Sequence, residues 1–357
     1  MNRSDMLAWL QEDNPVRLEH LWALADNERR ISVGDAVHIR GLIEFSNHCR
    51  SRCLYCGIRS DRTSIPRYRM TGEEILAAAR EAVARGYGTV VLQSGEDPAL
   101  DTEWLAGVVR RIKRETSLSV TLSCGERSEE ELAHWHAAGA DRYYIRFETS
   151  DRRLWNDIHP AGANGVSHRL DLLPRIKALG YETGSGIMVG IPGQTWRSLA
   201  EDIEWFRRLD LDMIGCGPYV PHRETPTGQA WLNRASLRPD PDQVHNNNLV
   251  VYKVTALARL TCPRVNIPAT TAVATVDRAG GYRLSLMRGA NVLMVNLTPL
   301  KYRNLYEIYP AKAGIHESAH DQRKRVDALL TGLGRVAGEG SGRSLNYEAP
   351  PRPVRLR

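Results

Sequence analysis

Apolar residues occur along most of this chain in short runs that are rich in β-branched side chains. From Val37 onward these runs alternate with helical patterns about every 25–35 residues, which is the signature of repeated βα units. The sequence predicts eight strands, at residues 38–45, 89–93, 119–123, 142–146, 183–189, 213–217, 265–268 and 291–295. This alternation predicts an α/β fold, a complete (βα)8 TIM-type barrel, and a doubly wound open sheet is the alternative.

Helix starts and changes of composition divide the chain into three parts. Thr71 and Ser128 each stand three residues before a glutamate and ahead of a helical pattern, which predicts capping boxes. Residues 1–35 carry apolar positions at helical spacing and predict an N-terminal helical segment, and residues 36–335 would form the barrel. Residues 336–357 are rich in glycine, serine and proline, and they predict a short, flexible C-terminal tail.

The composition limits the expected partners and cellular location of the protein, but it says little about the reaction. The 357-residue chain carries a net charge of +6, and its short basic runs lack interleaved aromatic residues, so we expect no nucleic-acid partner. We expect no membrane association, because no stretch approaches the roughly 20 apolar residues of a membrane span. The charged first residues lack the apolar region of a signal peptide. Three of the six cysteines are scattered, which is typical of the reducing cytosol, so we expect a cytoplasmic protein.

Three cysteines follow the first predicted strand directly. Cys49, Cys53 and Cys56 have the spacing C-x3-C-x2-C, which supplies three thiolates and no fourth. A four-iron cluster normally takes four cysteines, so three would leave one iron open to a cofactor or substrate. A zinc site is the weaker alternative, because it needs four ligands and the adjacent His48 would rarely reach the same ion. A disulfide framework would need an oxidising compartment and a small scaffold.

Polar residues at the ends of other predicted strands mark the rest of the candidate site, because the active sites of such barrels lie at the carboxyl ends of the strands. The segment 93–97 reads Gln-Ser-Gly-Glu-Asp, in which glycine allows close backbone approach and a carboxylate can accept from an ammonium group. The adjacent Thr270 and Thr271 suit a small anion or a carboxylate. Each segment alone is equally consistent with an ordinary loop.

The fourth predicted strand carries charges where apolar residues are expected. Alternation places Arg142, Tyr144 and Arg146 on one face, and Glu148 continues that face. Inward charges are costly without charged partners. The sequence therefore predicts either a structural network of ion pairs inside the barrel or a binding site for a ligand.

The cysteine triplet, with Tyr55 before its last member, resembles the signature of the radical S-adenosylmethionine (SAM) superfamily. Further segments resemble one family closely, the HydE maturases of [FeFe]-hydrogenase. The matching segments run in order from about residue 33 to residue 310, and they include TVVLQSGEDP, RYYIRFET, GIMVGIPGQT and NIPATTA.

This resemblance implies two cofactors and two sets of site residues. The cofactors would be SAM and one [4Fe–4S] cluster, whose metal ligands and catalytic centre would be Cys49, Cys53 and Cys56. The residues implied at the SAM site are Tyr55, Ser94, Glu96, Arg146, Glu148, Arg169 and Met188. The residues implied around the substrate are Gln93, Thr121, Arg142, Thr270, Thr271 and Met294.

The resemblance also implies an activity. Such an enzyme cleaves SAM reductively to a 5′-deoxyadenosyl radical, which in HydE acts on an iron–cysteinate complex bearing carbonyl and cyanide ligands. The product leads toward the diiron subcluster of the hydrogenase H-cluster. The implied partners are a small-molecule or organometallic substrate, an electron donor such as ferredoxin or flavodoxin, and transient contact with other hydrogenase maturases.

Several residues depart from the family pattern. Residues 312–320 contain no cysteine where some HydE proteins carry a second cluster, so we expect only one cluster here. Phe147 stands in place of a histidine, and Cys124 adds a thiol; both favour a relative with an altered substrate. The alternative functions are an amino-acid mutase resembling methylornithine synthase, with biotin synthase ranked lower, or a zinc-binding protein without catalytic activity.

Overall fold

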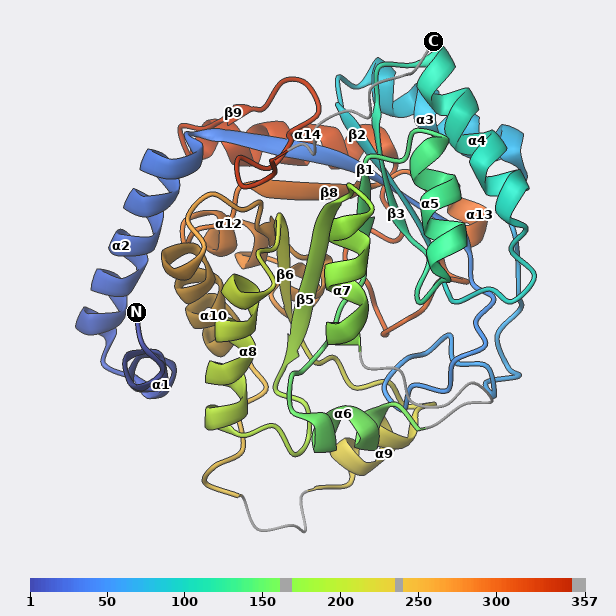
Figure 1. The fold of residues 1–357 in the computed structure, drawn as a ribbon. Helices are drawn as coiled ribbons and strands as arrows, with labels where there is room; N and C mark the ends of the chain where they lie inside the picture. Colours follow the sequence, from blue (N-terminus) through green and yellow to red (C-terminus); the bar gives the residue numbers. More distant parts are fainter. Residues whose placement is uncertain (161–168, 235–239, 349–357) are drawn as a thin grey trace.

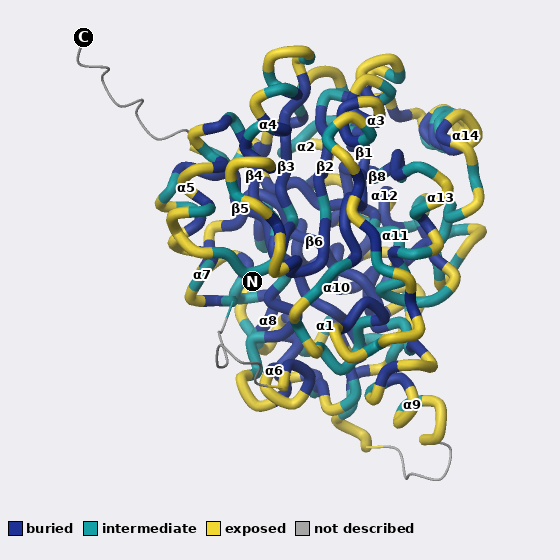
Figure 2. Tube along the Cα trace, turned by 90° about the vertical axis from the view of Figure 1, so that its right-hand side faces the viewer, coloured by how far each residue is buried: buried dark blue, intermediate teal, exposed yellow. Residues whose placement is uncertain are grey.

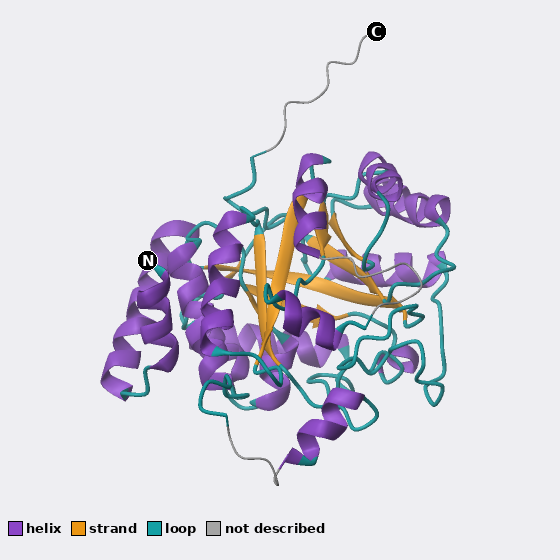
Figure 3. Cartoon of the chain, turned by 60° about the horizontal axis from the view of Figure 1, so that its bottom comes forward, coloured by secondary structure: helices purple, strands orange, loops and turns teal. Residues whose placement is uncertain are grey.

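The structure is a computed structural model that describes residues 1–160, 169–234 and 240–348. Its centre is a barrel of parallel strands surrounded by helices (Figures 1 and 3). The strands of the barrel are β1 (Ala36–Ser46), β2 (Thr89–Ser94), β3 (Ser119–Ser123), β4 (Arg142–Tyr144), β5 (Glu182–Val189), β6 (Met213–Pro218), β7 (Pro268–Ala269) and β8 (Val292–Asn296).

The strand order shows a barrel rather than an open sheet. Hydrogen-bonded neighbours follow the order β6-β5-β4-β3-β2-β1-β8-β7, and every pairing is parallel. The two ends of this order meet at an isolated parallel bridge between Met213 and Asn266, where Ile214 N–H donates to Asn266 O at 2.9 Å. The prediction of a (βα)8 barrel is therefore confirmed.

Two strands are shorter than the sequence predicts, and both differences have a local cause. The fourth strand ends at Tyr144 instead of Arg146, because the chain then turns and Glu148 adopts a left-handed φ of 61°. The seventh strand covers only Pro268 and Ala269, since proline lacks an N–H for the ladder and begins the strand instead of continuing one.

Helices cover the outside of the barrel, and Figure 2 shows buried strands inside helices whose outer faces are exposed. The predicted capping boxes at Thr71 and Ser128 are both present, and Asn2 and Thr195 form two more. The helices after β1 are α3 (Gly72–Ala84), α4 (Thr102–Glu115), α5 (Glu129–Ala137), α6 (Arg152–Ile158), α7 (Arg169–Ala178), α8 (Trp196–Arg208), α9 (Pro226–Leu232), α10 (Asn248–Thr261), α11 (Thr271–Val276), α12 (Gly281–Leu286), α13 (Leu300–Arg303) and α14 (Ala319–Gly332). Among the described residues, no helix is both long and apolar enough to cross a membrane.

The N-terminal segment forms two helices, α1 (Arg3–Gln11) and α2 (Pro15–Val33), which pack against α8 and α10. Met6 and Leu10 of α1 and Leu21 of α2 are fully buried in the same core as the barrel helices. These helices therefore extend the barrel's core.

The C-terminal segment differs from the flexible tail that its composition predicts. Strand β9 (Val336–Ala337) pairs with the start of β1, and the following backbone enters the amino-terminal end of the barrel. There the Ser341 carbonyl accepts from Thr89 Oγ1 at 2.7 Å, and the Gly342 carbonyl accepts from Asn266 Nδ2 at 2.9 Å. We call residues 338–344 the base plug. Residues 349–357, the rest of the predicted tail, lie outside the described part of the chain.

The path of the base plug depends on a close backbone contact between Gly340 and Gly88. A Cβ atom on Gly88 would stand 1.6 Å from the Gly340 carbonyl oxygen, so only glycine fits at that contact. Above the plug, Arg142 pairs with Glu182 at 2.7 Å, and Glu182 accepts from the Ser344 N–H at 2.9 Å. The plug thus supplies backbone partners to charges buried inside the barrel.

Candidate active site

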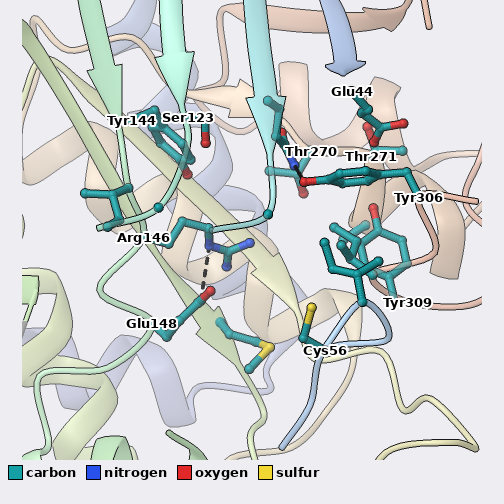
Figure 4. A pocket seen from close by; sticks show the side chains of 18 of the residues that line it. Glu44, Cys56, Ser123, Tyr144, Arg146, Glu148, Thr270, Thr271, Tyr306 and Tyr309 are labelled. Atoms are coloured by element: carbon teal, nitrogen blue, oxygen red, sulfur yellow. Dashed lines mark hydrogen bonds and ion pairs between the residues drawn. The ribbon is translucent and has the colours of Figure 1, made fainter. Parts of the chain in front are cut away.

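A cavity of about 300 Å³ lies at the carboxyl ends of the strands. Polar side chains from opposite walls face it (Figure 4). The apolar residues in its lining include Leu42, Val91, Met213 and Met294, which come from four different strands. The cavity stands where ligands bind in barrels of this kind.

The cysteine loop follows β1 and is shaped by one arginine. Arg67 donates to four backbone carbonyls of the loop region, including those of Asn47 at 2.6 Å and Ile58 at 2.8 Å. Asn47 adds a second anchor, because its amide nitrogen donates to Pro66 O at 2.8 Å and Leu305 O at 2.7 Å. This scaffold holds an irregular loop without helix or strand.

All three thiols of the loop are free and line the cavity. Burial raises the pKa of Cys49 and Cys53, and it raises the pKa of Cys56 to about 12. Buried thiols therefore stay protonated near neutral pH unless a cation stabilises the thiolates.

The donor set fits an iron–sulfur cluster better than a single ion. Among the described residues, no group of three His, Cys, Asp or Glu side chains is arranged to hold one metal ion. A four-iron cluster takes each thiolate at a different iron, so it suits three thiols spread around one cavity. Cys49, Cys53 and Cys56 would hold such a cluster, and its fourth iron would have no thiolate from this loop.

Glu96, after β2, lies against the cysteine loop. Its carboxylate accepts from Ser51 Oγ at 2.7 Å and pairs with Arg169 at 3.4 Å. Burial alone would raise the pKa of Glu96, but Arg169, the Ser51 hydroxyl, the Glu126 N–H and Arg50 together outweigh burial and hold that pKa below its usual value. The close contact requires Gly95, where a Cβ atom would stand 2.3 Å from the His48 carbonyl oxygen.

Arg169, at the start of α7, joins three strand ends. Besides Glu96, it pairs with Glu126 after β3 at 3.1 Å and donates to the Arg146 carbonyl after β4 at 2.8 Å. Its side chain is 11% exposed and lines the cavity. A buried guanidinium in this position can meet a carboxylate of a ligand without losing its protein partners.

Arg146 and Glu148 form a second ion pair, at 3.1 Å, on the β4 side of the cavity (Figure 4). Arg146 also donates to the Ile187 carbonyl. The left-handed turn at Glu148 lets its backbone pair with β5, donating to Gly186 O and accepting from Met188 N–H, each at 3.1 Å. The turn thus aims Glu148 into the cavity while the barrel stays paired.

Tyr55 links the cysteine loop to this ion pair. Its hydroxyl lies 3.4 Å from Glu148 Oε1 and 3.0 Å from His159 Nε2. His159 in turn stacks on Trp155, with ring centroids 4.3 Å apart. The aromatic residue of the cysteine motif therefore sits at the boundary between the cysteine loop and β4.

Most residues implied by the family resemblance meet in this one cavity. Gln93 donates to Tyr306 Oη at 3.2 Å, and Thr270 Oγ1 donates to the Cys216 carbonyl at 3.1 Å. The implied residues that line the cavity are Cys49, Cys53, Tyr55, Cys56, Gln93, Ser94, Glu96, Arg146, Glu148, Arg169, Met188, Thr270, Thr271 and Met294.

Thr121 and Arg142 are exceptions, because neither belongs to the lining of the cavity. They are register partners: Thr121 lies in the middle of β3, and Arg142 is the first residue of β4. Inward-facing residues of a barrel stack in layers, and this layer lies beneath the one that holds Arg146. Of the two hypotheses for the charges of the fourth strand, the structural ion pair describes Arg142, whereas Arg146 and Glu148 face the cavity.

Several lining residues are absent from the sequence-based prediction. Glu44, Tyr306, Tyr309 and Lys312 line the cavity, and Glu44 lies near Tyr306 in Figure 4. A signal for Glu44 was available, since Glu44 and Arg40 are the two charged residues within the mostly apolar run of the first strand. Lys312 carries no such signal, because it follows the last strand of the barrel in an irregular segment.

Two of the departures from the family pattern, Phe147 and Cys124, lie outside the cavity lining. Phe147 is fully buried, and its ring centroid lies 5.9 Å from that of Phe206 on α8. Cys124 is buried among apolar side chains, and burial raises its pKa to about 11. Neither position therefore offers direct contact with a ligand in this cavity.

Comparison with known proteins agrees with the fold and the cysteine motif. Residues 43–206 match the family model described as the Radical SAM superfamily. This chain is thus a radical SAM enzyme built on a (βα)8 barrel. It is 44% identical to the [FeFe] hydrogenase maturase subunit HydE of Thermotoga maritima, over 91% of this chain and 88% of that protein. The chain belongs to the HydE family.

More distant relatives share the barrel. The 3-methylornithine synthase of Methanosarcina acetivorans is 26% identical over 82% of this chain and 79% of that protein. The crystal structure of methylornithine synthase matches with a TM-score of 0.75 at 23% identity, over 95% of this chain and 94% of that chain. The hydrogenase maturase HydG of Carboxydothermus hydrogenoformans also gives 0.75, at 15% identity over 93% and 75% of the two chains. At these identities the solved structures establish the fold alone.

Proposed function

We propose that this chain is a radical SAM maturase of [FeFe]-hydrogenase that acts on an iron–cysteinate carbonyl cyanide precursor of the diiron subcluster. The observation that carries the proposal is the convergence of Cys49, Cys53 and Cys56 with buried ion pairs on one cavity. The likeness to the HydE maturase of Thermotoga maritima over most of both chains supports the choice of pathway.

The residues around the thiols suit the amino-acid end of SAM. Glu96 presents a carboxylate to an ammonium group, whereas Arg169 and Arg146 present guanidinium groups to a carboxylate. Tyr55 and Met188 supply polarisable surface for the remainder of the cofactor. With cluster and SAM bound, the chemistry supplied is one-electron cleavage of the sulfonium C5′–S bond to a 5′-deoxyadenosyl radical and methionine.

The other lining residues suit a substrate that has to react with this radical while water and other hydrogen donors are excluded. Gln93, Thr270 and Thr271 offer hydrogen bonds, and Met294 offers an apolar surface. The barrel wall keeps water and other hydrogen donors away from the reacting carbon. The electron would come from an external donor such as a ferredoxin or flavodoxin, and the product would pass to other maturases.

Anaerobic reconstitution tests this proposal. The protein is loaded with iron and sulfide, then given SAM and dithionite, and 5′-deoxyadenosine is quantified with and without a synthetic iron–cysteinate carbonyl cyanide complex. We expect nucleoside formation to rise with the complex. Nucleoside formed equally without the complex would contradict the proposed substrate, and no nucleoside under either condition would contradict the cluster assignment.

A further inference from the structure

Glu44 and Lys312 form an ion pair inside the cavity that the cofactor assignment does not use. Glu44 lies on β1, and Lys312 lies in the segment between α13 and α14; the two side chains are 1% and 5% exposed. Lys312 Nζ donates to Glu44 Oε1, and both residues line the cavity. Burying two charges is costly, and this pair stands on a wall that faces a ligand site rather than within the apolar core.

Both charged groups keep hydrogen-bonding capacity. Glu44 accepts one hydrogen bond from Lys312 and one from Asn296 Nδ2 at 3.0 Å, whereas a carboxylate offers about four acceptor positions. Lys312 donates to Glu44 and to the Tyr306 carbonyl at 3.2 Å, whereas an ammonium group has three N–H donors. Among the described residues, each group can therefore take a further partner from the cavity.

The position of the pair separates it from the residues expected around SAM. In Figure 4, Glu44 and Tyr306 stand on the opposite side of the cavity from Arg146 and Glu148. Strand β1 is also three places away from β4 in the order of the barrel. A ligand held at Glu44 would thus face the cofactor site instead of sharing it.

The charges of the lining select the kind of ligand. The lining carries three carboxylates and three cations, and each carboxylate is paired with a cation: Glu44 with Lys312, Glu96 with Arg169, and Glu148 with Arg146. A ligand with a single charge at Glu44 and Lys312 would leave a net charge buried. A zwitterion adds one charge of each sign, so it can satisfy both groups without that cost.

We propose that Glu44 binds the ammonium group and Lys312 binds the carboxylate group of an α-amino acid that forms part of the substrate. This inference rests on the proposed function, in which a cysteine carries the iron, and it assigns the residues that recognise that cysteine. Tyr306 and Gln93, which are hydrogen-bonded to each other beside Lys312, would border the side chain of the amino acid.

The test pairs three ligands with three variants of the reconstituted enzyme. The ligands are the iron complexes of L-cysteine, of 3-mercaptopropionate, which lacks the ammonium group, and of cysteamine, which lacks the carboxylate. The variants are Glu44→Gln, Lys312→Met and the matched control Glu182→Gln, which neutralises a buried ion-paired carboxylate outside the cavity lining. The apparent KM of each complex is read from 5′-deoxyadenosine formation.

We expect the unaltered enzyme to prefer the L-cysteine complex by roughly ten- to hundredfold, the range of one charge-assisted hydrogen bond. Glu44→Gln should remove the preference over the 3-mercaptopropionate complex, and Lys312→Met should remove the preference over the cysteamine complex. Glu182→Gln should keep both preferences. Equal weakening of all three complexes by the cavity variants, or no weakening, would overturn the inference and leave the pair a structural contact.

Two further measurements keep the test decisive. The double variant Glu44→Gln/Lys312→Met leaves no unpaired buried charge, so it can replace single variants that fail to fold, and it should lose both preferences. An enzyme that cleaves SAM but responds to no iron complex would contradict the proposed substrate instead of the inferred site. The three free ligands are then compared by calorimetric titration of the SAM-loaded protein, where absence of a preference for L-cysteine would overturn the inference.

Discussion

Arg142 Nε lies 2.7 Å from Glu182 Oε2 at the base of the barrel, and each side chain is 3% exposed. The Ser341 carbonyl accepts a second hydrogen bond from Arg142 at 3.0 Å. These partners are all structural, and none belongs to the lining of the cavity. The pair therefore connects the barrel to the base plug.

Replacing Arg142 with methionine is expected to lower the free energy of unfolding by about 3–5 kcal/mol, because Glu182 would stay buried without its ion-pair partner. Denaturant unfolding measures this change. Arg80→Met is the matched control, since Arg80 pairs with Glu115 at the surface with 54% of its side chain exposed; its effect should stay within about 1 kcal/mol. Equal stability of the two variants would show that the buried pair contributes nothing.

Replacing Arg146 with alanine should weaken SAM binding by about 1.5–3 kcal/mol, the range of hydrogen bonds to charged groups. The reason is that Arg146 faces the cavity and joins Glu148 to β5. Calorimetric titration of the reconstituted protein with SAM provides the measurement. Arg127→Ala is a suitable comparison, because the Arg127 side chain is also largely shielded, at 7% exposure against 28% for Arg146, but lies outside the lining. A similar loss of affinity in both variants would rule out a direct role for Arg146.

Replacing Cys53 with serine should abolish the iron–sulfur cluster and leave the barrel folded. The unaltered protein should bind about four irons per chain after anaerobic reconstitution. Iron and sulfide analysis, together with circular dichroism, measures both effects. Cys124→Ser is the matched control, because Cys124 is a buried thiol outside the cavity lining. This variant should retain the cluster. Loss of fold on Cys53→Ser would mean that the thiol has a structural role.

Asp202 should make stability depend on pH. Burial raises its pKa from 3.8 to about 7, against hydrogen bonds from Ser150 that lower it. A raised carboxyl pKa means that the folded state binds the proton more tightly, so the stabilising contribution is complete below about pH 4 and is lost as pH rises through about 7.

The unaltered protein should thus lose up to about 4 kcal/mol of unfolding free energy over this range through Asp202. Asp202→Asn cannot titrate, and the difference between the two stability curves isolates the effect. Chemical unfolding at a series of pH values gives both curves. Parallel curves for the two proteins would show that Asp202 ionises normally.

Replacing Gly88 with alanine should displace the base plug, because the new Cβ atom would stand 1.6 Å from the Gly340 carbonyl oxygen. We expect a loss of about 1–3 kcal/mol, as for other overpacked sites. Gly107→Ala is the matched control: a Cβ there meets nothing within 4 Å, and alanine favours its helix by about 0.5–1 kcal/mol. Thermal unfolding of the two variants should therefore shift in opposite directions, and equal shifts would dismiss the close contact.

Local patterns were sufficient to predict the barrel and much of its site. The cysteine spacing, the capping boxes and the segment around Glu96 are each carried by neighbouring residues, so the sequence shows them directly. Alternation also places Arg146 and Glu148 inward, and they do line the cavity. Alternation also places Arg142 inward but does not give its depth in the barrel. The family resemblance implies a place for Arg142 beside the substrate, whereas Arg142 pairs with Glu182 outside the cavity lining.

Long-range contacts account for the remaining differences. Lys312 meets Glu44 across 268 positions of sequence, and no local pattern signals such a pair. The base plug is glycine-rich and polar, a composition shared with flexible tails, but its backbone finds partners in Arg142 and Asn266 inside the barrel. The composition of that segment shows that it cannot form a hydrophobic core of its own. It does not show that the amino-terminal end of the barrel can hydrogen-bond to the backbone of the segment.

The base plug fills the amino-terminal end of the barrel. Ligands therefore have to enter the cavity from the other end, where the cysteine loop lies. SAM and a substrate seated at Glu44 would then enter the same cavity from the same end of the barrel. A stretch of glycine and serine without any reactive side chain would in this way decide from which side a reaction at the far end of the fold is supplied.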